Sequence, residues 1–295
     1  DLSFVPEIEA AGISFKNNNS TQDPLLTLKN AGVNYIRIRL WHSPSNGHSG
    51  MVEVKHLATR ARNLGLKIWL TVHYSDTWAD PGNQTKPVAW QNLNFSDLKS
   101  AVSVYTTQVV TEIKPEIIQI GNETNDGMLW PEGKASTNMA NFASMVNAGY
   151  NAVKAINSNI KVIVHLSNGY DNALFRWMFD GLKNNGANWD VIGVSLYPDV
   201  STWATLNTQC LANMNDMVTR YNKEVMVVEV GMSWDQATAC NAFLADIITK
   251  TKSIANDKGL GVFYWEPQAY NSWQGYTKGA FDNSGKPTVA LNAFN

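Results

Sequence analysis

The sequence predicts an α/β protein built as one (β/α)₈ TIM barrel, with residues 1–295 forming a single domain. Eight short apolar runs, rich in Val and Ile, alternate along the chain with segments of helical periodicity. The runs are mostly continuous, as is typical of parallel strands buried on both faces, and eight such units are the signature of the barrel. A doubly wound sheet is the alternative, but the sequence has no G-x-G-x-x-G or P-loop pattern to support it.

The expected elements follow one another in order. The expected strands are residues 13–15, 33–40, 67–72, 116–120, 161–166, 191–196, 225–230 and 260–265. The expected helices are residues 24–31, 52–64, 98–113, 139–156, 173–183, 206–221 and 240–256. Turn signals such as Asn63-Leu64-Gly65 end several helices, and Asp97 is expected to be an N-cap or first-turn acid.

The composition excludes several classes of protein. With 23 basic and 25 acidic residues the net charge is −2, so the chain lacks the basic excess of nucleic-acid-binding proteins. No apolar run approaches the roughly 20 residues of a membrane-spanning helix. Eleven tryptophans are an unusual supply, and exposed Trp is suited to stacking on a sugar face. Those expected on the loop face are Trp41, Trp78, Trp90, Trp130, Trp234, Trp265 and Trp273.

The first residue and the cysteines bear on the compartment. The chain starts at Asp1 without Met or an apolar leader, so we expect a mature product that is secreted, periplasmic or held at the cell surface. We also expect a monomer. Two cysteines, Cys210 and Cys240, are too few for a zinc cluster and are either two buried thiols or one disulfide.

In a barrel of this kind, catalytic residues lie at the carboxyl ends of the strands. The expected strand ends present Arg37, Arg39, Trp41, His73, Asp76, Asn122, Glu123, His165, Tyr197, Glu229, Trp265 and Glu266.

Two acids stand out among these residues. Glu123 and Glu229 each follow an apolar strand directly, on the fourth and seventh strands, which are nearly opposite in the ring. Two carboxyl groups across a barrel mouth can lie about 5–5.5 Å apart, the separation found in retaining glycosidases. One must be protonated and the other ionised, and their proximity favours that asymmetry. The alternative is that each acid is a structural partner of Arg37, Arg39 or a lysine.

Other candidates leave alternatives open. Asp76 and Asp80 lie in an aromatic loop and either bind sugar hydroxyls or cap a turn. Glu266 either faces inward or pairs with an arginine at the rim. His73 and His165, at strand ends, are expected in the site. No G-x-S-x-G elbow occurs, which argues against a serine hydrolase.

These residues resemble a known family. The chain is similar nearly end to end to the arabinogalactan endo-β-1,4-galactanases, family 53 of the glycoside hydrolases, in the retaining barrel clan. The similarity rests on long strings of residues, of which His73-Tyr74-Ser75-Asp76-Thr77-Trp78-Ala79-Asp80-Pro81 is the most specific. The others include residues 12–17, 32–41, 119–123, 128–131, 165–169 and 263–267.

The resemblance implies roles for individual residues. Glu123 would be the general acid/base and Glu229 the nucleophile of a double displacement, oriented by Arg37 and Tyr197. Asn122 would hold the sugar 2-hydroxyl, and Trp265 would form the floor of the subsite before the scissile bond. The expected substrate-binding set is Arg37, Trp41, His73, Asp76, Trp78, Asp80, Asn122, Trp130, His165, Tyr197 and Trp265. The partner would be the neutral polysaccharide β-1,4-galactan.

One departure from the family concerns the segment after Glu229. Bacterial relatives often carry a long calcium-binding loop there, whereas this chain shows no run of oxygen ligands with calcium spacing. We therefore expect no metal and no cofactor. A Cys210–Cys240 disulfide could hold the shortened loop, because helices six and seven are neighbours. The competing hypotheses are another endo-β-glycanase of the clan, such as a mannanase or cellulase, and a non-catalytic carbohydrate-binding protein.

Overall fold

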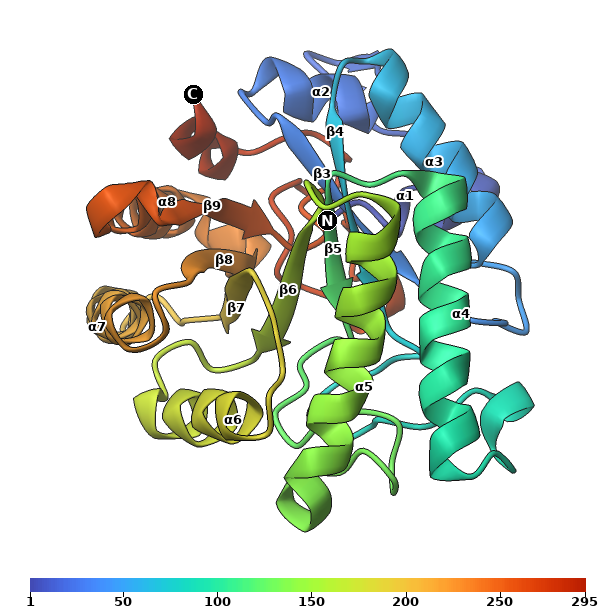
Figure 1. Cartoon of the computed structure of the whole chain (residues 1–295). Coiled ribbons are helices and arrows are strands. Elements are labelled where there is room, and N and C mark those ends of the chain that lie inside the picture. The colour runs from blue at the N-terminus through green and yellow to red at the C-terminus, as the bar shows by residue number, and fades with distance from the viewer.

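The computed structural model describes residues 1–295 and confirms the barrel. Seven parallel strands pair in the order β3-β4-β5-β6-β7-β8-β9, each with the next along the chain, and helices surround them (Figure 1). The strands are β3 Tyr35–Leu40, β4 Lys67–Val72, β5 Ile117–Ile120, β6 Lys161–Leu166, β7 Val191–Leu196, β8 Glu224–Val230 and β9 Gly259–Tyr264. The main helices are α2 Pro24–Asn30, α3 Met51–Asn63, α4 Phe95–Ile113, α5 Ala135–Ile156, α6 Asn172–Asn184, α7 Trp203–Tyr221 and α8 Ala237–Lys252.

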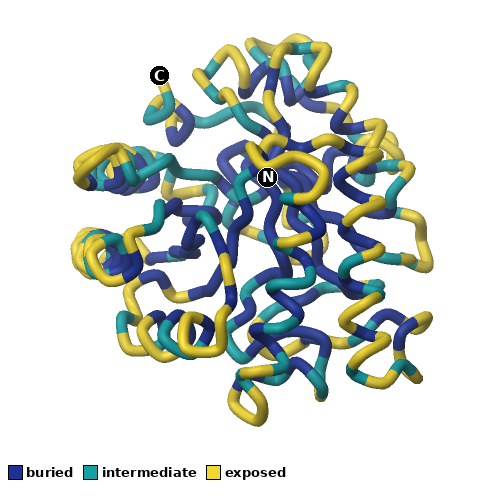
Figure 2. The backbone as a smooth tube through the Cα atoms, in the orientation of Figure 1, coloured by how far each residue is buried: buried dark blue, intermediate teal, exposed yellow.

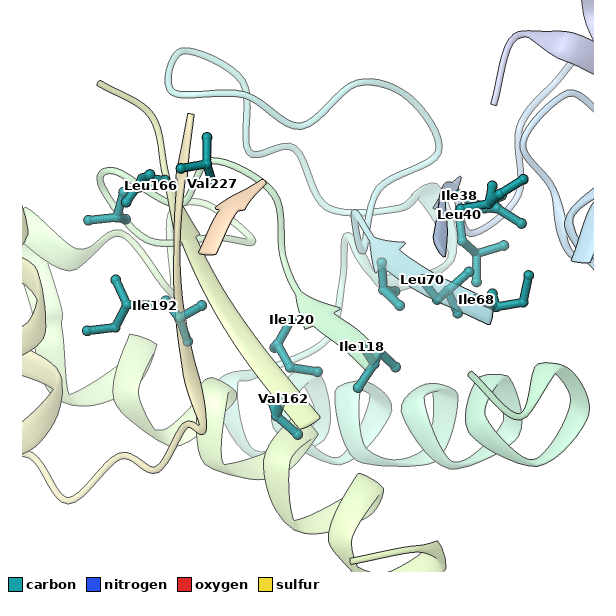
Figure 3. Packing of buried hydrophobic residues seen from close by; sticks show 14 of the residues in the cluster. Ile38, Leu40, Ile68, Leu70, Ile118, Ile120, Val162, Leu166, Ile192 and Val227 are labelled. Atoms are coloured by element: carbon teal, nitrogen blue, oxygen red, sulfur yellow. The ribbon is translucent and has the colours of Figure 1, made fainter. Parts of the chain in front are cut away.

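Alternate side chains of the strands divide into two cores. One set faces outward and packs against the helices, as the labelled side chains in Figure 3 illustrate, and belongs to a cluster of 68 buried residues. The other set faces the barrel axis and forms a second cluster of Trp69, Ile117, Ile163, Val191, Met226 and Val228. This division explains the continuous apolar runs of the sequence, because both faces of every strand are covered. Figure 2 shows the strands buried and the outer helix faces exposed.

The helices begin at recognisable caps. The side chain of Asp23 accepts a hydrogen bond from the backbone N–H of Leu25 at the start of α2. Asn94 caps α4 by accepting from the backbone N–H of Asp97, so Asp97 is a first-turn acid. No helix combines the length and hydropathy needed to span a bilayer.

The prediction of a first strand at residues 13–15 was wrong. These residues follow the short helix α1 Val5–Ala10 and lead into a two-residue hairpin, β1 Lys16–Asn17 with β2 Ser20–Thr21. Phe15 is buried because its ring packs edge-on against Tyr270 and Phe281, which is why an apolar residue stands there without a strand.

Residues 1–4 lie in the remaining gap of the barrel, between β9 and β3. The amino group of Asp1 donates to Tyr264 O at 2.6 Å, and the backbone N–H of Leu2 donates to Arg37 O at 3.1 Å. A cavity of about 540 Å³ lies alongside, at the amino-terminal ends of the strands and away from the predicted site. The seam of the barrel is therefore closed by a few specific bonds instead of a full strand ladder.

The predicted disulfide is also wrong, because both cysteines are free and buried. Cys210 on α7 faces inward, where its sulfur would lie 3.1 Å from a Cβ added to Gly169. Cys240 on α8 faces the hydroxyl of Tyr264, with 3.6 Å between sulfur and oxygen. Although the two helices are neighbours, each thiol packs onto the strand layer beneath its own helix.

Candidate active site

One cavity at the carboxyl ends of the strands gathers most of the predicted site residues. It has a volume of about 270 Å³. The predicted residues that line it are Arg37, His73, Trp78, Asp80, Asn122, Glu123, Tyr197, Glu229 and Trp265. Asp1, Arg39, Ala79 and Tyr276 complete the lining.

A local irregularity of the sheet aims Glu229 into this cavity. In the register between β7 and β8, Val194 pairs with Val227 and Ser195 with Glu229, so Val228 is an extra residue in β8. Strict alternation would put Glu229 on the same outward face as Val227. The bulge restores the inward direction, a frequent device beside active sites.

The carboxylate of Glu229 is held from two sides. The Arg37 guanidinium lies 2.8 Å from Oε1, and the Tyr197 hydroxyl donates to Oε2 at 2.8 Å. Burial and the nearby charge of Glu229 raise the pKa of Tyr197 well above its usual value, so this hydroxyl stays a donor. Arg37 is itself positioned by Asp1 Oδ2 at 2.9 Å and by Asn122 Oδ1 at 2.9 Å. Charge-assisted bonds of this kind fix the orientation of a carboxylate.

Glu123 lies in the same cavity in a different environment. It follows Gly121 at the end of β5, and both residues have a positive φ, which turns the chain sharply at the strand end. Burial, and secondly the negative charge of Glu229, raise the pKa of Glu123 from 4.5 to about 8. Glu123 therefore keeps its proton at neutral pH, next to an acid that has an arginine partner.

Asn122 is fixed between the two acids. Its Oδ1 accepts from Arg37 and, at 3.1 Å, from Gln119 Nε2, while its Nδ2 donates to Ala79 O at 2.8 Å. Since Nδ2 carries two hydrogens, one remains to donate to a ligand in the cavity.

An aromatic wall borders the cavity, formed by Trp78 and Trp265 with Trp41 behind them. The ring centroid of Trp78 lies 5.1 Å from that of Trp41 and 6.0 Å from that of Trp265. The Arg39 guanidinium stacks 4.1 Å from the Trp78 ring and pairs with the buried Glu266 at 3.5 Å. Glu266 is therefore the structural partner of an arginine, one of the two roles left open by the sequence.

Several predicted residues stand outside the cavity lining. Asp76 caps loops, since its two oxygens accept from the backbone N–H groups of Ser43 and Val88 at 2.9 and 2.8 Å. Trp41 is buried and donates to His73 Nδ1 at 3.3 Å. Trp130 donates from its ring nitrogen to Asp126 O at 2.8 Å.

Two further residues, which the sequence analysis placed in the site or on the loop face, are buried in the interior. His165 is fully buried beneath the cavity and bonds to neighbouring strands. Trp90, expected on the loop face, is also buried, because it packs against Tyr105 and Tyr74 beside α4.

Sequence reasoning missed four polar residues around the two acids: Asp1, Gln119, Ser195 and Tyr276. For Gln119 and Ser195 a signal existed, because each is a polar residue in an otherwise apolar, buried strand. Ser195 stands two residues before Tyr197, and alternate residues of a strand share a face. A polar residue two positions before a site residue, on the same strand, is therefore a candidate for a further contact with the site.

His73 lines the cavity as a neutral ring. Burial and the charge of Arg39 hold the pKa of His73 well below its usual value. Its Nδ1 accepts from the backbone N–H of Ala79 at 3.0 Å. His, Cys, Asp and Glu side chains form no group of three or more that could hold a metal ion.

Comparison with known proteins identifies the family. The sequence model of glycosyl hydrolase family 53 matches residues 1–294. The chain belongs to glycosyl hydrolase family 53. It is therefore a glycoside hydrolase, as the resemblance in the sequence implied.

Two relatives and one solved structure illustrate the match to family 53. An arabinogalactan endo-beta-1,4-galactanase of Thermothelomyces thermophilus is 32% identical, over 100% of this chain and 97% of the relative. A protein of the same name from Humicola insolens is 35% identical, over 90% of this chain and 88% of the relative. A structure from a study of two fungal β-1,4-galactanases superposes with a TM-score of 0.91 at 29% identity, covering 100% of this chain and 97% of the other.

Proposed function

We propose that this family 53 enzyme is a retaining endo-β-1,4-galactanase that cleaves the β-1,4-galactan chains of type I arabinogalactan. Glu123 is the general acid/base and Glu229 the nucleophile. The observation that carries the assignment is the contrast between the two acids in one cavity. Glu229 faces Arg37 and Tyr197, whereas burial and the charge of Glu229 raise the pKa of Glu123.

The first step forms a covalent galactosyl-enzyme. A carboxylate oxygen of Glu229 attacks the anomeric carbon while Glu123 gives its proton to the glycosidic oxygen. The bond between the anomeric carbon and the glycosidic oxygen breaks, and the leaving chain departs as an alcohol. The free amide hydrogen of Asn122 is available for the sugar 2-hydroxyl, a contact that strengthens in the transition state.

The second step releases the product. Glu123, now a carboxylate, takes a proton from a water molecule whose oxygen attacks the anomeric carbon, and the bond to Glu229 breaks. Both residues return to their starting protonation states, and the product keeps the β configuration.

The substrate is tested with unbranched β-1,4-galactan beside mannan, cellulose and xylan. We expect release of reducing ends from galactan alone, with an early fall in viscosity that marks cleavage inside the chain. Hydrolysis of mannan or cellulose in place of galactan would assign another endo-β-glycanase. Retention on a gel containing galactan, without any turnover, would assign a carbohydrate-binding protein.

The residue roles are tested with Glu123→Ala and Glu229→Ala, and with Glu112→Gln as the control. Glu112 pairs with Lys55 on the helices α3 and α4, away from the cavity. Removing an acid/base typically costs a factor of about 10²–10⁴ in rate. On an aryl galactobioside, whose leaving group departs without an acid, azide should rescue Glu123→Ala with formation of a β-glycosyl azide. A full rate in either alanine variant would refute its assigned role.

We also propose that the enzyme acts outside the cytoplasm, because its substrate is a polymer. A second proposal is that it acts as a monomer. Light scattering should give the mass of one chain, and cell fractionation should place the activity outside the cytoplasmic fraction. A dimer mass or a cytoplasmic activity would contradict these two points.

A further inference from the structure

The loop that follows β9 reaches back to the aromatic wall through the phenol of Tyr276. Tyr276 lines the cavity, and its ring packs edge-on against Trp265 at a centroid distance of 4.6 Å and an interplanar angle of 80°. Its hydroxyl donates to Trp265 O at 2.9 Å and to Lys278 O at 3.0 Å, so one hydrogen is shared between two backbone carbonyls. Tyr276 therefore contacts both the ring and the backbone of Trp265.

The hydroxyl of Tyr276 remains a donor at neutral pH. Burial, and secondly the negative charge of Glu266, raise the pKa of Tyr276 well above its usual value. The Lys278 carbonyl also accepts from the Tyr264 hydroxyl at 2.9 Å, so both lone pairs of this oxygen have a donor. Two phenols thus fasten the loop at the point where Tyr276 meets the cavity.

Gly231, directly after β8, lies against the same hydroxyl. A Cβ added at Gly231 would lie 2.6 Å from Tyr276 Oη, 3.1 Å from Lys278 O and 3.1 Å from Tyr197 Cε1. The φ of Gly231 lies outside the left-handed region, so its backbone conformation is open to other residues. It is the lack of space, and not the backbone, that requires a glycine here.

Tyr197 connects this crowded point to the nucleophile. Its hydroxyl donates to Glu229 Oε2 at 2.8 Å, and Cε1 of the same ring is the atom nearest to Gly231. Cε1 is bonded to the ring carbon that carries the hydroxyl, and the ring is rigid. A side chain in place of the Gly231 hydrogen would therefore move the hydroxyl that orients Glu229.

We propose that Gly231 and Tyr276 form a lock that joins the sugar-binding surface of Trp265 to the hydroxyl that orients Glu229. Tyr276 holds Trp265, and the missing side chain of Gly231 lets Tyr276 and Tyr197 occupy neighbouring positions. Both members of the lock are positioning residues, since each acts through another residue. The inference rests on the proposed function, with Glu229 as the nucleophile, and on Trp265 as a surface that contacts the sugar.

The Tyr276 half of the lock should affect substrate binding. Tyr276→Phe keeps the ring against Trp265 and removes only the hydroxyl bonds. Trp265 then supports the sugar less firmly in the bound state and in the transition state alike, so KM on galactan should rise about fivefold while kcat stays close to that of the wild type. The control is Tyr270→Phe on the same loop, which loses a bond to Ser14 O at 2.8 Å outside the cavity and should keep the wild-type KM.

The Gly231 half should affect the chemical steps. In Gly231→Ala the added Cβ presses on Tyr197 and disturbs the orientation of Glu229, so kcat should fall about tenfold or more while KM changes less. The control is Gly181→Ala on α6, where the Cβ would lie 2.5 Å from Met139 Cε, the flexible end of a side chain away from the cavity. Gly181→Ala should keep the wild-type kcat.

The decisive variant combines both changes. Gly231→Ala with Tyr276→Phe lacks the oxygen that the added Cβ would meet at 2.6 Å, although the approaches to Lys278 O and Tyr197 remain. We expect its kcat to be at least about threefold above that of Gly231→Ala, and its melting temperature to be higher. Tyr276→Phe would then be harmful in the wild-type chain and beneficial beside Gly231→Ala, a reversal that two independent losses do not produce.

The outcomes distinguish the lock from the proposed function. A double variant no faster and no more stable than Gly231→Ala would overturn the lock, and so would equal KM values for Tyr276→Phe and Tyr270→Phe. In both cases galactan hydrolysis by the wild type leaves the proposed function standing. If Gly231→Ala does not fold, a folded double variant supports the lock and an unfolded one overturns it. A wild-type chain that does not cleave galactan would instead remove the proposed function, and the melting temperatures would still test the contact.

Discussion

Glu123 and Glu229 show how one residue type takes two roles. Both end apolar strands, and nothing in the side chains themselves distinguishes them. The difference comes from neighbours: Glu229 touches Arg37 at 2.8 Å, whereas Glu123 has no arginine within salt-bridge distance. Assigning an acid and a nucleophile therefore depends on the partners of each carboxyl group.

The protonation of Glu123 predicts the alkaline limit of activity. The first step needs a protonated Glu123, so kcat/KM on galactan should fall as the pH rises through the pKa of about 8. The negative charge of Asp80 contributes to that raised pKa. Asp80→Asn should therefore move the alkaline limb to lower pH, while Asp97→Asn, at the exposed start of α4, should not. A shift to higher pH in Asp80→Asn would contradict the electrostatic explanation.

Much of the site was predictable at this scale, because strand ends in a barrel converge. Asn122, Glu123, Tyr197 and Glu229 were all identified as residues that follow apolar runs. Asp76 was assigned to substrate binding but caps loops instead. The sequence of a polar loop does not distinguish an acid that accepts from backbone N–H groups from one that binds a ligand. The neighbours of Glu123 were missed for another reason: no local pattern shows which polar side chains meet across strands.

At the scale of elements, the seven strands β3 to β9 and seven helices were recognised from periodicity. The first strand was not, because residues 1–4 carry no apolar run and make only isolated bonds to β9 and β3. The run at residues 13–15 is apolar because Phe15 packs in the core, and not because these residues pair with a strand. The bulge in β8 that aims Glu229 inward also left no mark in the sequence, since Val227, Val228 and Glu229 read as an ordinary strand.

Helix α5 approaches β5 closely through a glycine. A Cβ added at Gly149 would lie 2.9, 3.1 and 3.2 Å from side-chain atoms of Ile120. Ile120 is the last residue of β5 and is followed by Gly121, Asn122 and Glu123. Gly149→Ala should lower the free energy of unfolding by about 1–3 kcal/mol despite the higher helix propensity of Ala. Urea unfolding measures this loss. Asn151→Ala, exposed on the same helix, is the control, and equal stability of the two variants would contradict the close packing.

The free thiols give a second prediction for the elements. Burial raises the pKa of Cys210 to about 12 and that of Cys240 to about 11, so neither is a reactive thiolate at neutral pH. A thiol reagent should therefore find no reactive group in the folded protein and two in denaturant. Reduction should leave the mass unchanged, and a gain of two daltons would reinstate the disulfide.

At the scale of the whole molecule, the segment after Glu229 determines whether a cation is needed. The chain passes from β8 into the short helix η2, Trp234–Gln236, within a few residues. The backbone N–H of Trp234 donates to Thr277 O at 3.0 Å, and that of Gln236 to Ser233 O at 2.9 Å. The first bond fastens the segment to the loop after β9, and the second closes a turn within the segment. A calcium chelator should therefore leave the melting temperature unchanged, and a large drop would reveal a calcium site.

The aromatic wall has a consequence for how this enzyme can be observed. Trp41, Trp78 and Trp265 follow one another at centroid distances of 5.1 and 6.0 Å and interplanar angles of 81° and 54°, close enough for their ultraviolet transitions to couple. Such coupled rings dominate the near-ultraviolet circular dichroism of a protein and respond to small rotations. A saccharide that seats against Trp78 or Trp265 would thus report its own arrival, without a label. The tryptophans that suit a neutral ligand also make its binding visible.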